Sequence, residues 1–339
     1  MIAKDDIIIR KAVLHVLDTV HGKCVLSDEL LNPGPDLYEF IRTHIYKIFV
    51  SDDTKHCTFN PDTSLVYTLL NEWDEKDETS FLETSHKIAK FLYQTMGEGQ
   101  DIPAADLLFV SFQAESTFYL AMLKMNYKES YTHEVTVEES EELSTRIVKN
   151  HTLLPSSRVP EAIIINLEDY HIQLLEKKDE VNGKKIFYLS EKFLVCHTDL
   201  APKRKLTILN RVINDISNKY DGADYKTKMD TKSALQKEYT DRKSFDIEEI
   251  GSKLFGKDSA KKSEYDEKME KYDLQFDNFT VTNESTVKKL DRQVIITDSG
   301  IEISVPMETY NKLADFEVKT DVTGKSTIII RNIDNLILK

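Results

Sequence analysis

The chain has 339 residues and the composition of a globular protein, with 40% hydrophobic and 31% charged residues. Aliphatic and aromatic residues recur throughout, which excludes a disordered chain, and no run reaches the roughly 18 apolar residues of a membrane span. A formal net charge of -14 argues against a general nucleic-acid binder. The length favours two domains, or one domain with a large appendage.

Charge is unevenly distributed along the chain. Residues 201–262 contain 15 Lys and Arg against 10 Asp and Glu. That difference of +5 leaves -19 for the remainder, concentrated in Asn71–Glu78 and Glu134–Leu143. Because these segments carry opposite net charges, we expect them to have different functions.

The start of the chain carries an apolar triplet beside Asp5 and Asp6, which does not predict a signal peptide. The three cysteines Cys24, Cys57 and Cys196 are far apart and odd in number. We therefore expect reduced thiols in a cytosolic protein.

The first two hundred residues alternate between strand and helix patterns. Branched aliphatics predict an opening strand over Asp6–Asp18. A helix capped by Asp36 follows, and the clearest helix spans Ser80–Met96, with a capping-box pattern at Ser80 and Glu83.

Strands dominate the remainder of this part. Ala105–Phe112 and Thr117–Leu123 are predicted to pair across a short polar turn. Further strands are predicted at Glu161–Leu167, Tyr170–Lys178 and Lys184–Ser190, with a hairpin turn at Asn182 and Gly183. The pattern predicts an α+β domain, residues 1–200, with a mostly antiparallel sheet.

From residue 201 the pattern becomes helical. Lys203–Tyr220 carries an apolar stripe at helical spacing. Further helices are predicted at Tyr225–Tyr239, Asp246–Phe255 and Ser259–Tyr272. We expect a basic helical segment over residues 201–275.

Residues 276–339 predict a small mixed α/β unit that completes a C-terminal domain, residues 201–339. Its predicted elements are a helix at Ser285–Gln293, a hairpin at Val294–Val305, a helix at Pro306–Leu313, and strands at Phe316–Thr320 and Ser326–Asn332.

Recognisable catalytic motifs are scarce. Nucleotide-binding glycine loops, zinc-protease motifs and nucleophile elbows do not occur, which lowers the expectation of nucleotide or hydrolase chemistry. The adjacent pairs His56–Cys57 and Cys196–His197 are poor chelates, because strand neighbours point to opposite faces. We expect neither a metal site nor a cofactor.

One enzyme-like pattern remains. Asp169, Glu176 and Lys178 lie in two predicted strands as D…ExK, an arrangement in which carboxylates hold Mg²⁺ and a lysine assists the attacking water. The alternative, which we favour, is a solvated hairpin edge whose charges discourage aggregation.

The basic segment offers a candidate binding site rather than a catalytic one. Lys203, Arg204 and Lys205 open a predicted helix, where each cation costs ~0.3–1 kcal/mol against the helix dipole. That cost disappears if a phosphate binds there, because free N–H groups already attract anions. The predicted footprint continues with Arg211, Lys226, Lys228 and Lys232. Alternatively these cations form intramolecular pairs, such as Arg211 with Asp215 at i+4.

The order of segments resembles the bacterial nucleoid-associated protein family of the NdpA type. The resemblance covers nearly the whole chain. It includes "IIIRKAVLHVLD", "DLLFVSF…TFYLAMLKMNY", "IIINLEDYHIQLL" and, most specifically, "YDLQFDNFTVTNESTVKKLDRQVIITDSGIEISVPMETYN".

This resemblance implies double-stranded DNA as the ligand and no catalytic activity. Lys288 and Arg292 match basic positions of the family's C-terminal helix and, being four apart, are expected to share a helix face. A solvated helix face is the alternative. The family's glycine-rich turn is reduced here to Gly300.

The leading hypothesis is a cytosolic, nucleoid-associated, non-enzymatic protein that binds DNA mainly through phosphates. Two alternatives remain: an acidic module that docks on another DNA-handling protein, and a Mg²⁺-dependent nuclease. DNA-metabolism proteins are candidate partners, no membrane association is expected, and a homodimer is expected because exposed strand edges favour two-fold pairing.

Overall fold

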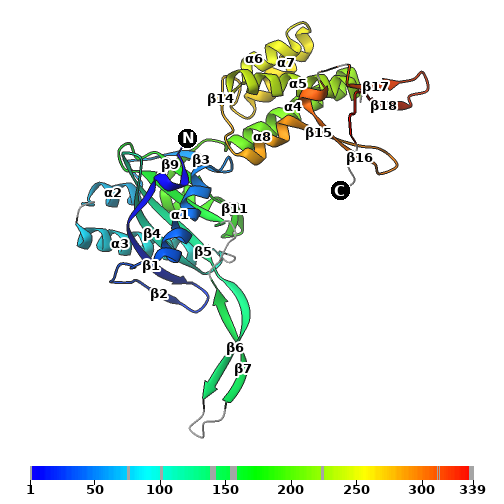
Figure 1. Ribbon diagram of the computed structural model, residues 1–339. Helices are drawn as coiled ribbons and strands as arrows, with labels where there is room; N and C mark the ends of the chain where they lie inside the picture. Colours follow the sequence, from blue (N-terminus) through cyan, green and yellow to red (C-terminus); the bar gives the residue numbers. More distant parts are fainter. Residues whose placement is uncertain are drawn as a thin grey trace. The chain divides into compact units, whose positions relative to one another are not determined.

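The computed structural model describes residues 2–74, 77–99, 102–137, 143–152, 159–222, 225–310, 312 and 314–335. The chain divides into two compact units, Met1–Leu200 and Ala201–Lys339 (Figure 1). Helices and antiparallel sheets both contribute substantially, which confirms the α+β class. None of the helices in the described ranges is long and apolar enough to cross a lipid bilayer.

The first unit is built on a sheet. Its eight described strands lie in the order β12-β3-β9-β8-β5-β4-β1-β2, and every neighbouring pair is antiparallel, as predicted. The strands are β1 (Ile7–Asp18), β2 (Lys23–Val25), β3 (Lys55–Phe59), β4 (Ala105–Ala114), β5 (Thr117–Asn126), β8 (Glu161–Asn166), β9 (Ile172–Leu175) and β12 (Cys196–Thr198).

Helices cover both faces of this sheet. They are α1 (Pro35–Phe49), α2 (Leu65–Asn71) and α3 (Glu78–Gly97), preceded by the short η1 (Lys4–Asp6). Successive side chains of β4 alternate between two cores: Leu107 and Phe109 pack with α2 and α3, whereas Leu108 and Val110 pack with α1. A strand covered on both sides is buried along nearly its whole length.

The predicted helix caps were wrong. Gly34 caps α1, so Asp36 lies inside the first turn. Asp77 caps α3 by accepting hydrogen bonds from two backbone N–H groups of its first turn. Ser80 instead accepts from the backbone N–H of Asp74.

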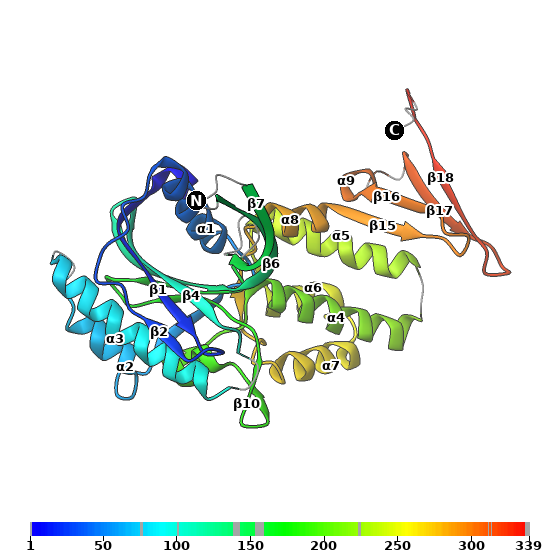
Figure 2. The ribbon, with the colours of Figure 1, turned by 90° about the horizontal axis from the view of Figure 1, so that it is seen from below.

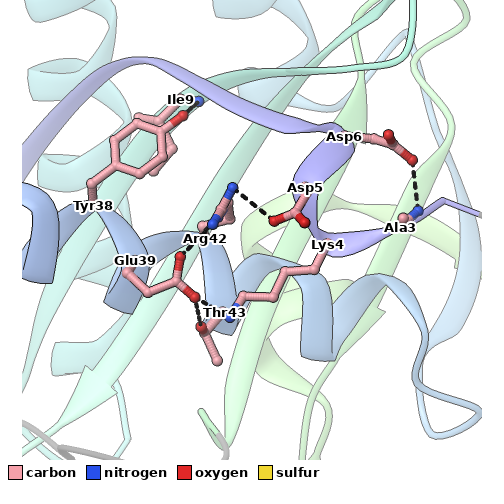
Figure 3. A network of polar contacts seen from close by, with 9 residues as sticks. All are labelled: Ala3, Lys4, Asp5, Asp6, Ile9, Tyr38, Glu39, Arg42 and Thr43. Atoms are coloured by element: carbon pink, nitrogen blue, oxygen red, sulfur yellow. Dashed lines mark hydrogen bonds and ion pairs between the residues drawn. The ribbon is translucent and has the colours of Figure 1, made fainter.

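Polar contacts attach α1 to the start of β1 (Figure 3). Arg42 donates to Glu39 at 2.6 Å and lies 3.1 Å from Asp5. The hydroxyl of Tyr38 accepts from the backbone N–H of Ile9 at 3.1 Å. These contacts fix the helix whose apolar face completes the core beneath it.

Two hairpins leave this sheet. The first joins β10 (Asp179–Val181) to β11 (Lys184–Ile186) through Asn182 and Gly183, whose φ angles of 52° and 75° confirm the predicted turn. The predicted strand continuing to Ser190 is cut short, because the helical segment η2 (Leu189–Leu194) begins there.

The second hairpin was not predicted. It pairs β6 (Lys128–Val137) with β7 (Leu143–Thr152) as a ribbon that projects from the sheet of its unit (Figure 1).

The second unit begins with helices, followed by small hairpins, as predicted. The helices are α4 (Pro202–Asp221), α5 (Tyr225–Arg242), α6 (Ile247–Phe255), α7 (Ser259–Glu270), α8 (Glu284–Asp291) and α9 (Met307–Tyr310). The paired strands are β13 (Phe245–Asp246) with β14 (Asn278–Phe279), β15 (Arg292–Ile296) with β16 (Glu302–Pro306), and β17 (Phe316–Thr320) with β18 (Ser326–Ile330). The predicted apolar stripe of α4 is buried at Leu206, Leu209, Ile213 and Ile216.

A buried ion pair ties two central strands of the first unit. Lys124 of β5 and Glu161 of β8 are direct cross-strand partners, 2% and 0% exposed, with Nζ and Oε2 2.8 Å apart. Burial lowers the pKa of Lys124 even though Glu161 opposes that shift. Each charge is therefore stabilised mainly by the other.

Replacing Lys124→Met is expected to reduce the free energy of unfolding by about 3–5 kcal/mol, because Glu161 is left buried without its partner. The double variant Lys124→Met/Glu161→Met should recover most of that loss. The single tryptophan, Trp73, packs against Phe81 in the first unit and reports its urea unfolding by fluorescence. A double variant as unstable as the single one would contradict this account.

Candidate nucleic-acid interface

The first turn of α4 carries cations and no acidic residue. Ala201 is the N-cap and provides no side-chain hydrogen bond, while Pro202 occupies the first turn. Lys203 and Arg204 are exposed. Lys205 instead forms an ion pair with Asp277 at 2.7 Å, so the predicted cation cluster is divided between solvent and an internal contact.

A pocket of about 320 Å³ is lined by residues of α4, α5 and α8. In the second unit, α5 packs against both α4 and α8 (Figure 2). Its lining residues are Lys203, Leu206, Thr207, Asn210, Asn214, Lys232, Leu235, Ser285, Thr286, Lys289 and Leu290. Three of them are lysines, and none of these described residues is a carboxylate. In a chain of net charge -14, this is a concentrated positive environment.

Lys232 is the half-buried lysine of the pocket. Its ammonium donates a hydrogen bond to the side-chain oxygen of Gln293, a neutral acceptor. Burial lowers the pKa of Lys232, because desolvation disfavours its charged form. A bound anion would oppose this effect by neutralising the charge where it lies.

Lys289, exposed on α8, is the pocket lysine that sequence reasoning missed. It follows Ser285 and Thr286 by four and three residues, a spacing that places all three on one helix face. The spacing could have indicated this shared face from the sequence. Only the packing of α8 shows that the face lines the same pocket as Lys203 and Lys232.

The structure separates the two C-terminal cations that were predicted to share a helix face. Helix α8 ends at Asp291, so Arg292 adopts extended backbone and begins β15. Its Nε donates to Ser304 Oγ at 3.0 Å. Lys288 lies 3.0 Å from Glu284 on the exposed side of α8. The prediction that Lys288 and Arg292 share a helix face was therefore wrong.

Arg211 contacts an aromatic ring rather than the expected carboxylate. Its guanidinium lies 5.4 Å from the ring centroid of Tyr272 and donates to the Tyr272 hydroxyl. Asp215 lies 3.9 Å from Lys268. The predicted Arg211–Asp215 pair was wrong. Lys226 and Lys228 belong to α5, but their side chains lie outside the described residues.

The D…ExK residues do not form a common site. The side chain of Glu176 is fully buried. It accepts from Lys55 at 2.8 Å and from the backbone N–H and the hydroxyl of Ser190 at 3.0 and 2.8 Å. Asp169 lies in a turn and accepts from a backbone N–H. The Lys178 ammonium lies 5.0 Å from the ring centroid of Phe187. Glu176 therefore holds the fold together and is not open to a metal.

Two cysteines that are distant in sequence lie together. Cys57 of β3 and Cys196 of β12 occupy neighbouring strands as free thiols. The neighbouring Cys196 thiol and burial both raise the pKa of Cys57. His56 Nδ1 lies 2.8 Å from His171 Nε2. Within the described ranges, no group of three or more His, Cys, Asp or Glu is arranged to hold a metal ion.

Comparison with known families identifies the chain. Residues 13–337 match the family described as nucleoid-associated protein YejK. The chain belongs to this family. Membership confirms the resemblance drawn from the sequence and supports a nucleoid-associated role. No curated protein matches the chain.

The structural role of Glu176 can be tested directly. Glu176→Gln is expected to lower the free energy of unfolding by about 2 kcal/mol, because Lys55 loses its buried counter-charge. The exposed Asp169→Asn serves as control and should change stability by less than about 0.5 kcal/mol. Trp73 fluorescence measures both. Equal stability of the two variants would contradict the assignment.

Proposed function

We propose that the protein is a non-enzymatic, nucleoid-associated protein that binds duplex DNA through its phosphates. The pocket lined by Lys203, Lys232 and Lys289 carries this proposal, because it gathers three cations without a lining carboxylate among the described residues. Family membership supports the nucleoid-associated part of it. Arg204, exposed beside Lys203, extends the positive surface.

Outside this pocket, cations of the second unit form ion pairs within the protein. Many other described cations there already have carboxylate partners. These pairs are Lys205–Asp277, Lys219–Glu264, Arg242–Glu249, Lys253–Glu238, Lys261–Asp221, Lys262–Asp266, Lys288–Glu284, Lys312–Glu308 and Arg331–Glu317. The pocket differs in that three lysines line it and no carboxylate does among its described residues, which suits an external anion.

Contacts of this kind position a duplex and carry little sequence information. Lysine ammonium groups meet phosphate oxygens as point charges, without the bidentate geometry that distinguishes bases. The amino-terminal end of α4 adds the positive end of its dipole. We expect weak sequence preference and strong salt dependence.

The double variant Lys203→Ala/Lys289→Ala is expected to weaken duplex binding by on the order of tenfold per lost contact near 0.1 M salt. The slope of log affinity against log salt should fall by about two units, since each phosphate contact contributes about one. Fluorescence anisotropy with random-sequence duplexes at several salt concentrations measures both quantities.

The matched control is Lys257→Ala/Lys271→Ala, which removes the same charge from exposed positions outside the pocket lining. Equal losses in both double variants would mean that only net charge matters. A shift in base preference would argue against phosphate contacts as the mechanism.

The pH dependence of binding should trace to Lys232. Because burial lowers its pKa, its positive charge is lost at lower pH than that of an exposed lysine, and affinity should fall as pH rises through that range. Lys232→Arg keeps the charge and should flatten the fall. The control Lys237→Arg, at an exposed position of α5, should retain it. Anisotropy titrations from pH 7 to 10 test this, and an unchanged fall in Lys232→Arg would exclude Lys232.

A second candidate function, docking of a basic protein segment, has its own supporting feature. A groove of about 680 Å³ beside α6 and α7 is lined by Glu248, Glu267 and Glu270, and its Phe276 is 78% exposed. Carboxylates around an exposed aromatic ring suit a Lys- or Arg-rich segment with an apolar anchor. If the purified protein fails to bind DNA even at low salt, this second function becomes the better one.

A further inference from the structure

The pocket lined by Lys203, Lys232 and Lys289 has the size of a small-molecule site. Its volume of about 320 Å³ falls at the lower end of the roughly 300–1,000 Å³ typical of such sites. A single phosphate group would fill only part of it. A duplex presents its phosphates outermost and keeps its bases stacked inside. Phosphate contacts therefore account for the lysines of the pocket and leave the rest of its lining unexplained.

Apolar side chains form part of this lining. Leu206 of α4 and Leu235 of α5 are 7% and 2% exposed, and Leu290 of α8 is partly buried. Leucines offer neither charge nor hydrogen bonds to a phosphate. They suit a flat apolar group, because proteins that hold an unstacked base pack it between aromatic or apolar side chains.

Polar groups open to a ligand lie beside the leucines. Thr286 is 7% exposed, and its hydroxyl makes no hydrogen bond to any residue that the structure describes. A hydroxyl buried in this state costs free energy until a ligand supplies its partner. On α4, the Asn210 amide donates to the Leu206 carbonyl at 2.8 Å, which leaves its side-chain oxygen as an acceptor. The amide of Asn214, one turn further along, is unpaired within the described part of the chain.

We infer that this pocket binds one nucleotide whose base is unpaired, with the phosphate at the lysines and the base against the leucines. The Asn214 amide offers a donor beside an acceptor, the pattern that pairs with an adenine edge. Thr286 supplies a further hydrogen bond. The inference rests on the proposed function, because the nucleotide and a duplex phosphate use the same lysines. A bound nucleotide therefore displaces the duplex.

Calorimetric titration of the full chain without DNA tests the site. The probes are adenosine 5′-monophosphate and a short oligodeoxyadenylate strand, which share the unpaired nucleotide. At least one should bind about tenfold more tightly than hexyl phosphate and inorganic phosphate, which lack the base.

Thr286→Val removes the hydroxyl and keeps the shape of the side chain. It should weaken binding of the nucleotide probe about threefold to tenfold. Its affinity for duplex should not change, since a duplex phosphate reaches the exposed Lys203 and Lys289 rather than a buried hydroxyl. Thr240→Val, exposed on α5 outside the pocket lining, is the matched control and should alter neither affinity.

Competition against a labelled duplex, followed by anisotropy, identifies the source of the nucleotide. Displacement by adenosine 5′-monophosphate indicates a free nucleotide, and displacement by the strand alone indicates an unpaired unit of a strand. Hexyl phosphate binding as tightly as both probes, or Thr286→Val leaving their binding unchanged, would overturn the inference. Duplex binding that still depends on Lys203 and Lys289 would then leave the proposed function standing. Nucleotide binding without duplex binding would do the reverse.

Discussion

The gathering of three lysines around one pocket is the constraint on which the proposed site depends. Lysines brought together without carboxylates repel one another and lose hydration, and both effects oppose folding. The packing of α4, α5 and α8 brings Lys203, Lys232 and Lys289 to one pocket whose described lining includes no carboxylate. An arrangement that opposes stability in the free protein becomes favourable once an anion occupies it, which is why we place function there.

Local sequence signals predicted much of the fold. Asn182 and Gly183 specified their turn because both adopt positive φ, and the apolar runs of β4 and β5 specified buried neighbouring strands. Helix caps failed because Gly34 caps α1 without any side-chain hydrogen bond, and because Asp77, three residues before Ser80, caps α3. The ribbon of β6 and β7 was missed because its mixed polar and apolar residues lack the regular alternation of a strand against a core.

The site was predictable only in part, because its selection depends on contacts between distant residues. The sequence marks Lys203, Arg204 and Lys205 alike, yet only Lys205 meets Asp277. Lys289 looks like any exposed lysine until α8 is packed. Arg292 was placed on a helix that ends one residue earlier, and element ends are the least certain part of any pattern. Glu176 is a residue that the sequence pattern marked as a possible metal ligand. Its side chain is buried and paired with Lys55, which gives it a structural role instead.

A net charge of -14 and DNA binding are compatible because electrostatic fields have a limited range in salt. At about 0.1 M ionic strength the Debye length is about 10 Å, so a phosphate at the pocket interacts mainly with Lys203, Lys232 and Lys289. Carboxylates farther away than this are largely screened. At low ionic strength their field reaches further and opposes the approach of a duplex. In the proposed mode of binding, local charge would govern contact with a duplex, while net charge would limit how much of the surface the duplex can cover.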